Sequence, residues 1–403
     1  MDLAETAGYF TTARHEALRC EVREFAEQHV GPELAKAEQT GDVNYELAHM
    51  IARQGWIGVT VGSEFGGMDA GHLAKTIMLE ELSAVSAAAG AITQASQLGV
   101  AKLLHYGTPA QKQRWLPAIA AGECLPTIAV TEEESGGNVL DMTTSAVRDG
   151  EDYVLNGHKT FVGNSHVGDL HGVVLRTGPG SRGLTAFLVE SWRGGCSVVP
   201  PSRSISLPGF SFGKIVFNDC RVPAANMIGS EGDGLQVAYS SSLLYGRPNL
   251  TAVALGIHRA LHARTVAFAK AQHRKGRPLY EIPVVKDKLG RMQSLWMTSR
   301  LLAYHAAHLL DSGLSCDAEL INAKVTGVES LIESVDLAMS LYGAPGLDQS
   351  QQMSRVWSDA QAMRPPAGTT DIQHIRLAEI ALGIARQPWS VVHQSAHEWG
   401  AAS

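Results

Sequence analysis

The sequence lacks the cysteine patterns that would indicate disulfides or a zinc site. Its five cysteines lie far apart along 403 residues, and no two form a Cys-x-x-Cys pair. Structural zinc sites use closely spaced Cys and His ligands, so we expect no metal site. Scattered single cysteines are typical of a reduced protein, and we expect a cytoplasmic one. The five are Cys20, Cys124, Cys196, Cys220 and Cys316.

The sequence also lacks a long apolar run and an excess of positive charge. No stretch approaches the roughly 18 apolar residues that a membrane-spanning helix needs. Residues 1–5 have neither the basic start nor the apolar stretch of a signal peptide. Lys and Arg number 33 against 40 Asp and Glu, a net charge of −7. That balance argues against nucleic-acid or membrane-surface binding.

What the sequence does contain is typical of a globular protein with a large core. Hydrophobic residues make up 45% and charged residues 18%. The length favours two or three domains. Neither an internal repeat nor a low-complexity segment interrupts the chain.

Helical patterns fill the first third of the chain. Residues 16–30 are rich in helix formers with apolar residues at near-helical spacing, so we expect a helix there. The glycine-rich stretch 62–67 predicts a turn. A long Ala-rich helix is expected over 71–98. These segments form a predicted N-terminal helical domain, 1–124.

β-strand patterns dominate the next hundred residues and predict a middle β domain, 125–234. Asn156 followed by Gly157 is a strong signal for a turn. The predicted strands are the β-branched, alternating runs 127–131, 153–155, 172–175, 184–189 and 214–217.

Helical patterns return after residue 235 and predict a C-terminal helical bundle, 235–403. A narrow apolar seam in it should pack against another helix, within the chain or across an oligomer. The fold class is therefore mainly α with a central β domain. The seam residues are Ile321, Val325, Val328, Ile332 and Val335.

This order of domains, with five short motifs, resembles the acyl-CoA dehydrogenase superfamily over nearly the whole chain. Each motif is weak alone, but their order and spacing together are specific. They are Ile57-Gly-Val-Thr-Val-Gly-Ser-Glu-Phe-Gly-Gly, Tyr106-Gly-Thr-Pro-Ala-Gln-Lys, Val130-Thr-Glu with Gly136-Gly-Asn, Asp152-Tyr-Val-Leu-Asn-Gly-His-Lys, and Phe217-Asn-Asp-Cys-Arg-Val-Pro.

The resemblance implies an N-terminal helical domain, a middle β-barrel-like domain and a C-terminal four-helix bundle. It also implies FAD between the β domain and the bundle, and dimers or tetramers. The usual reaction is α,β-dehydrogenation of an acyl thioester on coenzyme A or on an acyl carrier protein. A carboxylate removes the α-proton and the flavin accepts the β-hydride.

Both positions where the resemblance puts the catalytic carboxylate lack one. In most relatives a Glu precedes a Gly-Thr pair, and here Ala367 precedes Gly368 and Thr369. In some relatives the Glu precedes an Arg at the start of the bundle, and here Gly246 precedes Arg247. Neither alanine nor glycine can accept a proton.

The flavin-binding motif is eroded. Phe161 replaces the Trp that flanks the flavin, Gly163 a Thr, and Gly137 the Ser of the flavin loop. In the segment that, by the resemblance, would contact the FAD of a neighbouring subunit, Gln272 stands in place of an Arg and Lys275 in place of a Phe. Lys275 offers a point charge without the geometry of Arg. The implied FAD contacts are Val130, Thr131, Gly136, Gly137, Phe161, Gly163, Gly343 and Thr369.

Asp371 and His374 are the candidates for a substitute base. An Asp in the first turn of a helix more commonly stabilises its N-terminus, and His374 more commonly faces solvent or a subunit contact. Thr370 and Gln373 form a capping-box pattern that predicts a helix start. The acidic run 132–134 indicates either a solvated loop or a loop that no longer approaches a dinucleotide.

Tyr245 and Arg247 are the candidates for substrate binding. Tyr-Gly-Arg at this place resembles family members that process acyl groups on carrier proteins in polyketide pathways, which indicates secondary metabolism.

Three hypotheses remain. The first, which we adopt, is an FAD-dependent oxidoreductase acting on an acyl thioester without the usual base. The second is a flavin monooxygenase of the same fold, which needs no such base. The third is a member without redox chemistry, either a partner subunit in a heteromer or a flavin-independent enzyme.

Overall fold

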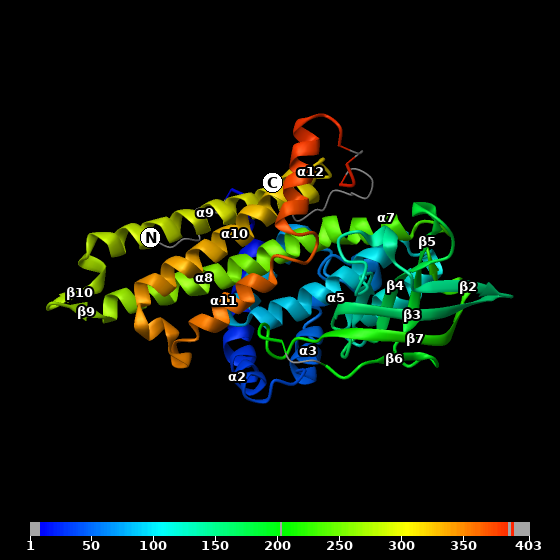
Figure 1. Ribbon diagram of the computed structural model, residues 1–403, viewed down its shortest axis with the longest axis horizontal. Coiled ribbons are helices and arrows are strands. Elements are labelled where there is room, and N and C mark those ends of the chain that lie inside the picture. Colours follow the sequence, from blue (N-terminus) through cyan, green and yellow to red (C-terminus); the bar gives the residue numbers. More distant parts are fainter. Residues whose placement is uncertain (1–8, 202–203, 386–387, 391–403) are drawn as a thin grey trace.

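The computed structural model describes residues 9–201, 204–385 and 388–390. They form two helical regions separated by a β domain, in the order that the sequence predicts. The sheet lies at one end of the molecule, and three long helices run toward the other end (Figure 1). The ends of the chain considered above, residues 1–5 and 391–403, lie outside the described residues. The long helices are α8 (Arg247–Ala271), α9 (Pro283–Asp311) and α10 (Asp317–Tyr342).

The first helical region contains six α-helices. The helix expected over 16–30 is present, but its last turn, Ala26–Val30, is a π-helix that continues into the next helix. The glycine-rich stretch forms a short 3-10 turn, Ser63–Phe65. The six helices are α1 (Ala13–Phe25), α2 (Gly31–Thr40), α3 (Tyr45–Ala52), α4 (Gly71–Val85), α5 (Ala87–Tyr106) and α6 (Pro109–Ala120).

The single helix expected over 71–98 is wrong, because two helices meet at Ser86. The backbone of Ser86 is extended, with φ −146° and ψ 117°, and its hydroxyl accepts a hydrogen bond from the N–H of Ala89 at 3.3 Å. Serine competes for backbone hydrogen bonds and favours helix starts over interiors. The Ala-rich pattern continues across this break and conceals it.

The β domain is one eight-stranded sheet with strand order β6-β7-β3-β2-β4-β5-β8, and β1 pairs with β4 in parallel. All five predicted strands are present, as β1, β3, β4, β5 and β7; β2, β6 and β8 are short and were not predicted. The strands are β1 (Pro126–Ala129), β2 (Ser145–Asp149), β3 (Asp152–Gly163), β4 (Leu170–Arg176), β5 (Leu184–Glu190), β6 (Cys196–Val198), β7 (Phe212–Pro223) and β8 (Met227–Ile228).

The turn expected at Asn156 and Gly157 is also wrong, because β3 runs straight through both residues. The pairing of β3 with β7 shifts register here, which marks a β-bulge. Gly157 has φ +126°, and a Cβ there would lie 2.8 Å from Thr144 Cα, so only glycine fits. The Asn156 amide donates to the carboxylate of Asp219 at 3.0 Å. The chain turns earlier, at Gly150, between β2 and β3.

The C-terminal region packs its helices around the seam that the sequence predicts. Val328, Ile332 and Val335 of α10 share a buried cluster with Val253 and Ile257 of α8, so the seam packs within the chain. Within the described residues, no helix combines the length and apolar character that crossing a bilayer requires. The remaining elements are α7 (Gly234–Ser241), the hairpin of β9 (His273–Arg274) and β10 (Arg277–Pro278), α11 (Met353–Ala362) and α12 (Thr370–Ala381).

Two buried carboxylates on α4 join the first helical region to the bundle. Glu81 accepts hydrogen bonds from Arg23 of α1 at 3.0 Å and from Arg259 of α8 at 2.6 Å. Glu80 accepts one from the Tyr304 hydroxyl of α9 at 2.5 Å. Burial alone would raise the pKa of Glu81, but the guanidinium groups of Arg259 and Arg23 outweigh burial and lower it to about 2.

We predict that Glu81→Gln lowers the free energy of unfolding by about 3–5 kcal/mol, because it leaves buried guanidinium groups unpaired. Glu46→Gln is the matched control; its pair with Arg53 is exposed and is worth at most about 1 kcal/mol. Urea unfolding at pH 7 measures both.

The effect of Glu81→Gln also depends on pH. The pKa of Glu81 is lower in the folded chain than its usual 4.5, so its contribution is present above pH 4.5 and is lost as the pH falls toward 2. The difference between wild type and variant should shrink across that range. A difference that stays constant down to pH 3 would contradict this account.

Candidate functional site

The two positions that lack a carboxylate face each other. Gly246 ends a π-helical turn, Ser242–Gly246, directly before α8, and Ala367 lies in the loop between α11 and α12. A Cβ built on Gly246 would lie 3.0 Å from the Cβ of Ala367 and 3.5 Å from Leu98 of α5. Two places far apart in the sequence thus meet at one point, and neither supplies a proton acceptor. We call it the 246–367 contact.

Two side chains brace the loop that carries Ala367. The buried Lys324 of α10 donates to the carbonyl oxygens of Arg364 at 2.8 Å and Gly368 at 3.0 Å. Gln373 donates to the carbonyl of Ala367 at 2.6 Å. Burial lowers the pKa of Lys324 to about 8, so the ammonium stays charged at neutral pH. Backbone φ at Ala367 is +56°, a strained value for alanine that these bonds stabilise.

The brace was not identified from the sequence. Lys324 lies between the seam residues Ile321 and Val325. A lysine beside an apolar seam is the one feature of the sequence that indicates a buried charge at this place. Gln373 was assigned instead to a capping box with Thr370.

The capping-box prediction is wrong in detail, although a helix does begin at Thr370. The N-cap residue is Thr369, whose hydroxyl accepts from the N–H of Ile372 at 3.4 Å. Gln373 turns its amide back to the loop carbonyls and does not reach the N-cap backbone. Asp371 and His374 both lie exposed on α12 in the single chain.

Tyr245 points away from the 246–367 contact into the first helical region. It is buried, and its hydroxyl donates to Thr60 at 3.1 Å. Its ring lies against the ring of His72, at 5.0 Å between centroids, and 4.0 Å from the ammonium of Lys75. Burial raises the pKa of Tyr245 to about 12. The phenol therefore stays neutral in this polar cluster.

Arg247 is a buried cation next to the 246–367 contact. Its Nε and Nη1 have no hydrogen-bond partner among residues 9–201, 204–385 and 388–390. Burial lowers its pKa to about 10, so the guanidinium remains charged at neutral pH. A buried charge without a partner is costly. Arg247 therefore has hydrogen-bonding capacity that a bound acceptor could use.

On the β side, the loop after β1 is held by a buried ion pair. Lys159 of β3 donates to Glu132 at 2.8 Å and to the carbonyl of Val130 at 2.9 Å, and the N–H of Thr160 donates to the carbonyl of Thr131 at 2.8 Å. Burial would raise the pKa of Glu132, but hydrogen bonds from Lys159 and the 143–144 segment lower it to about 2. Glu132 is thus a structural anchor.

The acidic run therefore does not behave as one solvated face. Glu132 is buried, whereas Glu133 pairs with Lys214 at the surface and Glu134 is exposed. Beyond them, Cβ atoms added to Gly136 and Gly137 would meet nothing within 4 Å. The glycine part of the loop is therefore open to a group from outside the chain.

Phe161 and Gly163 lie at the end of β3. Phe161 sits in a bulge with φ +52° and exposes 59% of its surface, beside the ring of Phe212 at 5.4 Å between centroids. A Cβ on Gly163 would lie 3.0 Å from Phe210 Cζ and 3.0 Å from Ala95 Cβ. The ring of Phe210 thus crowds the place where a threonine side chain would stand.

Gly343 and the two positions assigned to a neighbouring subunit lie at the opposite end of the molecule, whereas Thr369 caps α12 beside the 246–367 contact. Gln272 and Lys275 are in the β9–β10 hairpin beyond the end of α8, far from the sheet (Figure 1). Gly343 follows Tyr342, whose ring stacks on Phe268 near that end of α8, at 3.8 Å between centroids. The 25 residues of α8 span about 37 Å. One chain therefore does not bring the two halves together.

The residues present fit a flavin on the β side. The exposed ring of Phe161 offers an aromatic platform, and the open glycine loop leaves room for close backbone approach. On the phosphate side, the hairpin that the resemblance assigns to a neighbouring subunit carries three cations, Arg274, Lys275 and Arg277. Within the described part of the chain, no group of three or more His, Cys, Asp or Glu side chains is placed to hold a metal.

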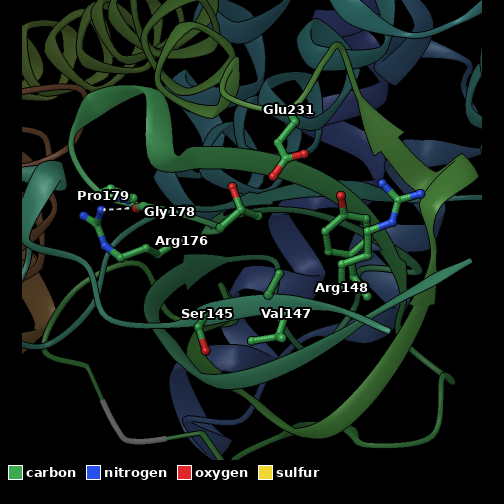
Figure 2. Close-up of a pocket in the computed structure, with 10 residues that line it drawn as sticks. Ser145, Val147, Arg148, Arg176, Gly178, Pro179 and Glu231 are labelled. Atoms are coloured by element: carbon green, nitrogen blue, oxygen red, sulfur yellow. Dashed lines mark hydrogen bonds between the residues drawn. The ribbon is translucent and has the colours of Figure 1, made fainter. Parts of the chain in front are cut away.

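A cavity of about 420 Å³ lies elsewhere, among β2, β3, β4 and the loop after β4. Arg148 and Arg176 lie on opposite sides of it in Figure 2, with Glu231 between them in the upper part of the view. Arg176 donates to the carbonyls of Met142 and Gly178, each at 2.9 Å, so it braces loops. None of the site residues predicted from the sequence lines this cavity.

Known protein families match this chain across all three of its regions. Models of the N-terminal, middle and C-terminal domains of acyl-CoA dehydrogenase match residues 12–123, 127–220 and 232–382. An acyl-CoA dehydrogenase of Bacillus subtilis is 31% identical over 91% of this chain and 97% of its own length.

Solved structures agree. Butyryl-CoA dehydrogenase from Megasphaera elsdenii superposes with a TM-score of 0.89 at 25% identity, covering 92% of this chain and 98% of that one. The prolyl acyl carrier protein oxidase AnaB superposes with a TM-score of 0.87 at 24% identity, covering 92% and 99%, and shows the shared fold.

We predict that Lys324→Met loosens the loop that holds Ala367. The variant removes the lysine donor of the Arg364 carbonyl, at about 1–3 kcal/mol, and leaves the Gly368 carbonyl only the 3.3 Å bond from Gln373. Amide hydrogen exchange over residues 364–373 should become faster, and the unfolding midpoint in urea should fall. Lys286→Met, at an exposed position on α9, is the control and should change neither. Unchanged exchange in Lys324→Met would show that the brace is not needed.

Proposed function

The chain belongs to the acyl-CoA dehydrogenase superfamily, and on that premise we propose that it is a flavoprotein oxidoreductase acting on an acyl thioester. The thioester would be carried by coenzyme A or by an acyl carrier protein, as the names of the two solved relatives indicate for those proteins. We further propose that it works without a carboxylate at either family position, as a dimer or larger oligomer.

The 246–367 contact is the observation that supports this proposal. Its two positions converge, and Lys324 and Gln373 hold the loop around it in a defined shape. The place where a substrate would meet its base is therefore maintained, while the base itself is absent.

FAD, when bound, would supply the two-electron acceptor. Phe161 would support its ring, and the backbone of loop 130–137 would approach the part next to the ring. The N-terminus of α12, capped by Thr369, would favour negative charge, as would Lys275 of a second copy. Arg247 would donate to the thioester end of the substrate from its unpartnered Nε and Nη1.

The α-proton has no acceptor at the contact itself. Asp371 and His374 remain the candidates from the sequence, although both are exposed in a single chain. The exposed first-turn position of Asp371 suits a charge that stabilises the start of α12. Asp371→Asn and His374→Gln, assayed for substrate turnover, decide whether either side chain takes the proton.

A role without redox chemistry is the second candidate, and two observations favour it. Phe210 crowds Gly163, where relatives offer a hydroxyl to the flavin, and Glu133 and Glu134 add negative charge to the flavin loop. Such a member would be a partner subunit or a flavin-independent enzyme.

Absorbance spectroscopy separates the two candidates. The proposal predicts flavin bands near about 370 and 450 nm at close to one FAD per chain, and loss of the 450 nm band when an acyl thioester is added without oxygen. A colourless protein that ignores added FAD would reject the oxidoreductase and leave the second candidate. Oxygen uptake without product desaturation would instead indicate a monooxygenase.

We predict that Ala367→Glu confers or raises dehydrogenation of a simple substrate such as butyryl-CoA, by about 10²–10⁴-fold, because a positioned general base is worth that much. Turnover is followed with an artificial electron acceptor. Ala367→Gln has the same shape without a base and should gain nothing. Equal rates in the two variants would show that the contact is not where the substrate reacts.

A further inference from the structure

A layer of carboxamides lies one helical turn from the 246–367 contact. Asn249 of α8 contacts Gln97 of α5, Gln94 lies one turn before Gln97 on α5, and all three are buried. Gln94 precedes Leu98 by four residues on α5, and Leu98 lies 3.5 Å from the built Cβ of Gly246. Asn249 follows Gly246 by three residues. Residues three or four apart share a helix face, so the layer borders the contact.

A chain of hydrogen bonds fixes how these amides point. Gln97 donates through Nε2 to the carbonyl of Trp56 at 3.2 Å, so its Oε1 is the atom that faces Asn249. Asn249 must then donate through Nδ2, at 3.3 Å, and its Oδ1 is left as an acceptor. This Oδ1 has no hydrogen-bond partner within the described residues.

Gln94, on the α5 side of the interface, also has a buried acceptor without a donor in the described part of the chain. Its side chain is 8% exposed, and its Oε1 also has no partner within the described residues. A buried acceptor without a donor costs stability, and native proteins rarely keep two side by side. Two such acceptors lie on facing helices, next to the place where a substrate would react. They are therefore suited to bind a donor group of the substrate.

A second cavity, of about 360 Å³, lies beyond the point where Gly90 of α5 packs against Val253 of α8. It is lined by Ala87 at the start of α5 and by Ile257 on α8, two turns beyond Asn249. A hydrocarbon chain that extended from the contact toward this cavity would have to pass the carboxamide layer without satisfying it.

We propose that the acyl group bound at this site is short and carries a hydrogen-bond donor: a hydroxyl that donates to Gln94 Oε1 or Asn249 Oδ1, or an amino group that donates to both. The donor would lie about 5.4 Å, one helical turn, beyond the 246–367 contact. The inference rests on the proposed function, because it assigns the substrate class to the same site. Gln94 and Asn249 are then residues that determine specificity, and they take no part in proton or electron transfer.

Binding of matched ligands to the FAD-loaded protein tests this assignment. The probes are the butanoyl, 3-hydroxybutanoyl and 4-hydroxybutanoyl amides of aminopantetheine, in which nitrogen replaces the thioester sulfur. Isothermal titration calorimetry should show at least one hydroxylated probe binding about tenfold or more tightly than the butanoyl probe, because its hydroxyl gives a donor to a buried acceptor that the butanoyl probe leaves unsatisfied.

Two variants assign the preference to the carboxamides. Gln94→Met removes one unpartnered acceptor at similar volume, should fold with an unchanged or higher melting temperature, and should lose most of the preference. Gln94→Met combined with Asn249→Leu should abolish it. Ser334→Ala is the control; the Ser334 hydroxyl on α10 is another buried polar group without a partner in the described part of the chain, and its removal should leave the preference intact.

The outcomes separate this inference from the proposed function. If the butanoyl probe binds as well as the hydroxylated ones, or if the preference survives in the double variant, the carboxamide layer holds only water and the inference fails alone. If no probe binds to the wild type, the acyl-thioester function fails and the inference fails with it.

Discussion

The structure depends on two carboxylates that are buried where four helices cross. Glu80 and Glu81 on α4 are inaccessible to solvent, and Arg19, Arg259 and Arg300 surround them from α1, α8 and α9. Uncompensated, such charges would unfold the protein, so the helices that carry the guanidinium groups must meet at this place. This requirement aligns α8 along α4 and α5. The same alignment sets Gly246 against Leu98 and Asn249 against Gln97, so the positions of these site residues follow from a network outside the site.

The sequence predicted the fold well and its local details less well. Order of domains, five strands and the apolar seam of α10 follow from hydrophobic periodicity, which tertiary packing then uses directly. Errors arose where one residue overrides a pattern. Ser86 breaks an Ala-rich run, and Gly157 forms a bulge in place of a turn because β3 pairs with β7 on both sides of it. The break at Ser86 comes from a local helix cap, whereas the bulge at Gly157 depends on a strand distant in the sequence.

The candidate site shows the same limit. The loss of the carboxylate at Ala367 and Gly246 was readable from motif position alone, but their mutual contact was not. The roles of Lys324, Gln373 and Asn249 depend on which carbonyl or amide each one meets across the fold. The acidic neighbours of Glu132 indicated a solvated loop as one of two alternatives. In the structure Glu132 is instead buried and paired with Lys159, and it anchors the loop. The family resemblance identified which residues occupy the functional positions. The structure adds which of those residues contact one another.

The central claim is that the flavin site is complete only when two copies of the chain combine their opposite ends. Complementation tests it most directly. Gly137→Trp blocks the open glycine loop, and Gln272→Glu with Lys275→Glu cancels the net positive charge of the hairpin, where Arg274 and Arg277 remain; FAD bound per chain is measured for each variant and for both after co-expression. In a randomly mixed dimer, one of the two sites in each mixed pair is intact, so the account predicts about one quarter of the wild-type FAD in the mixture and almost none in either variant alone. A mixture as empty as its components would contradict a site shared between copies.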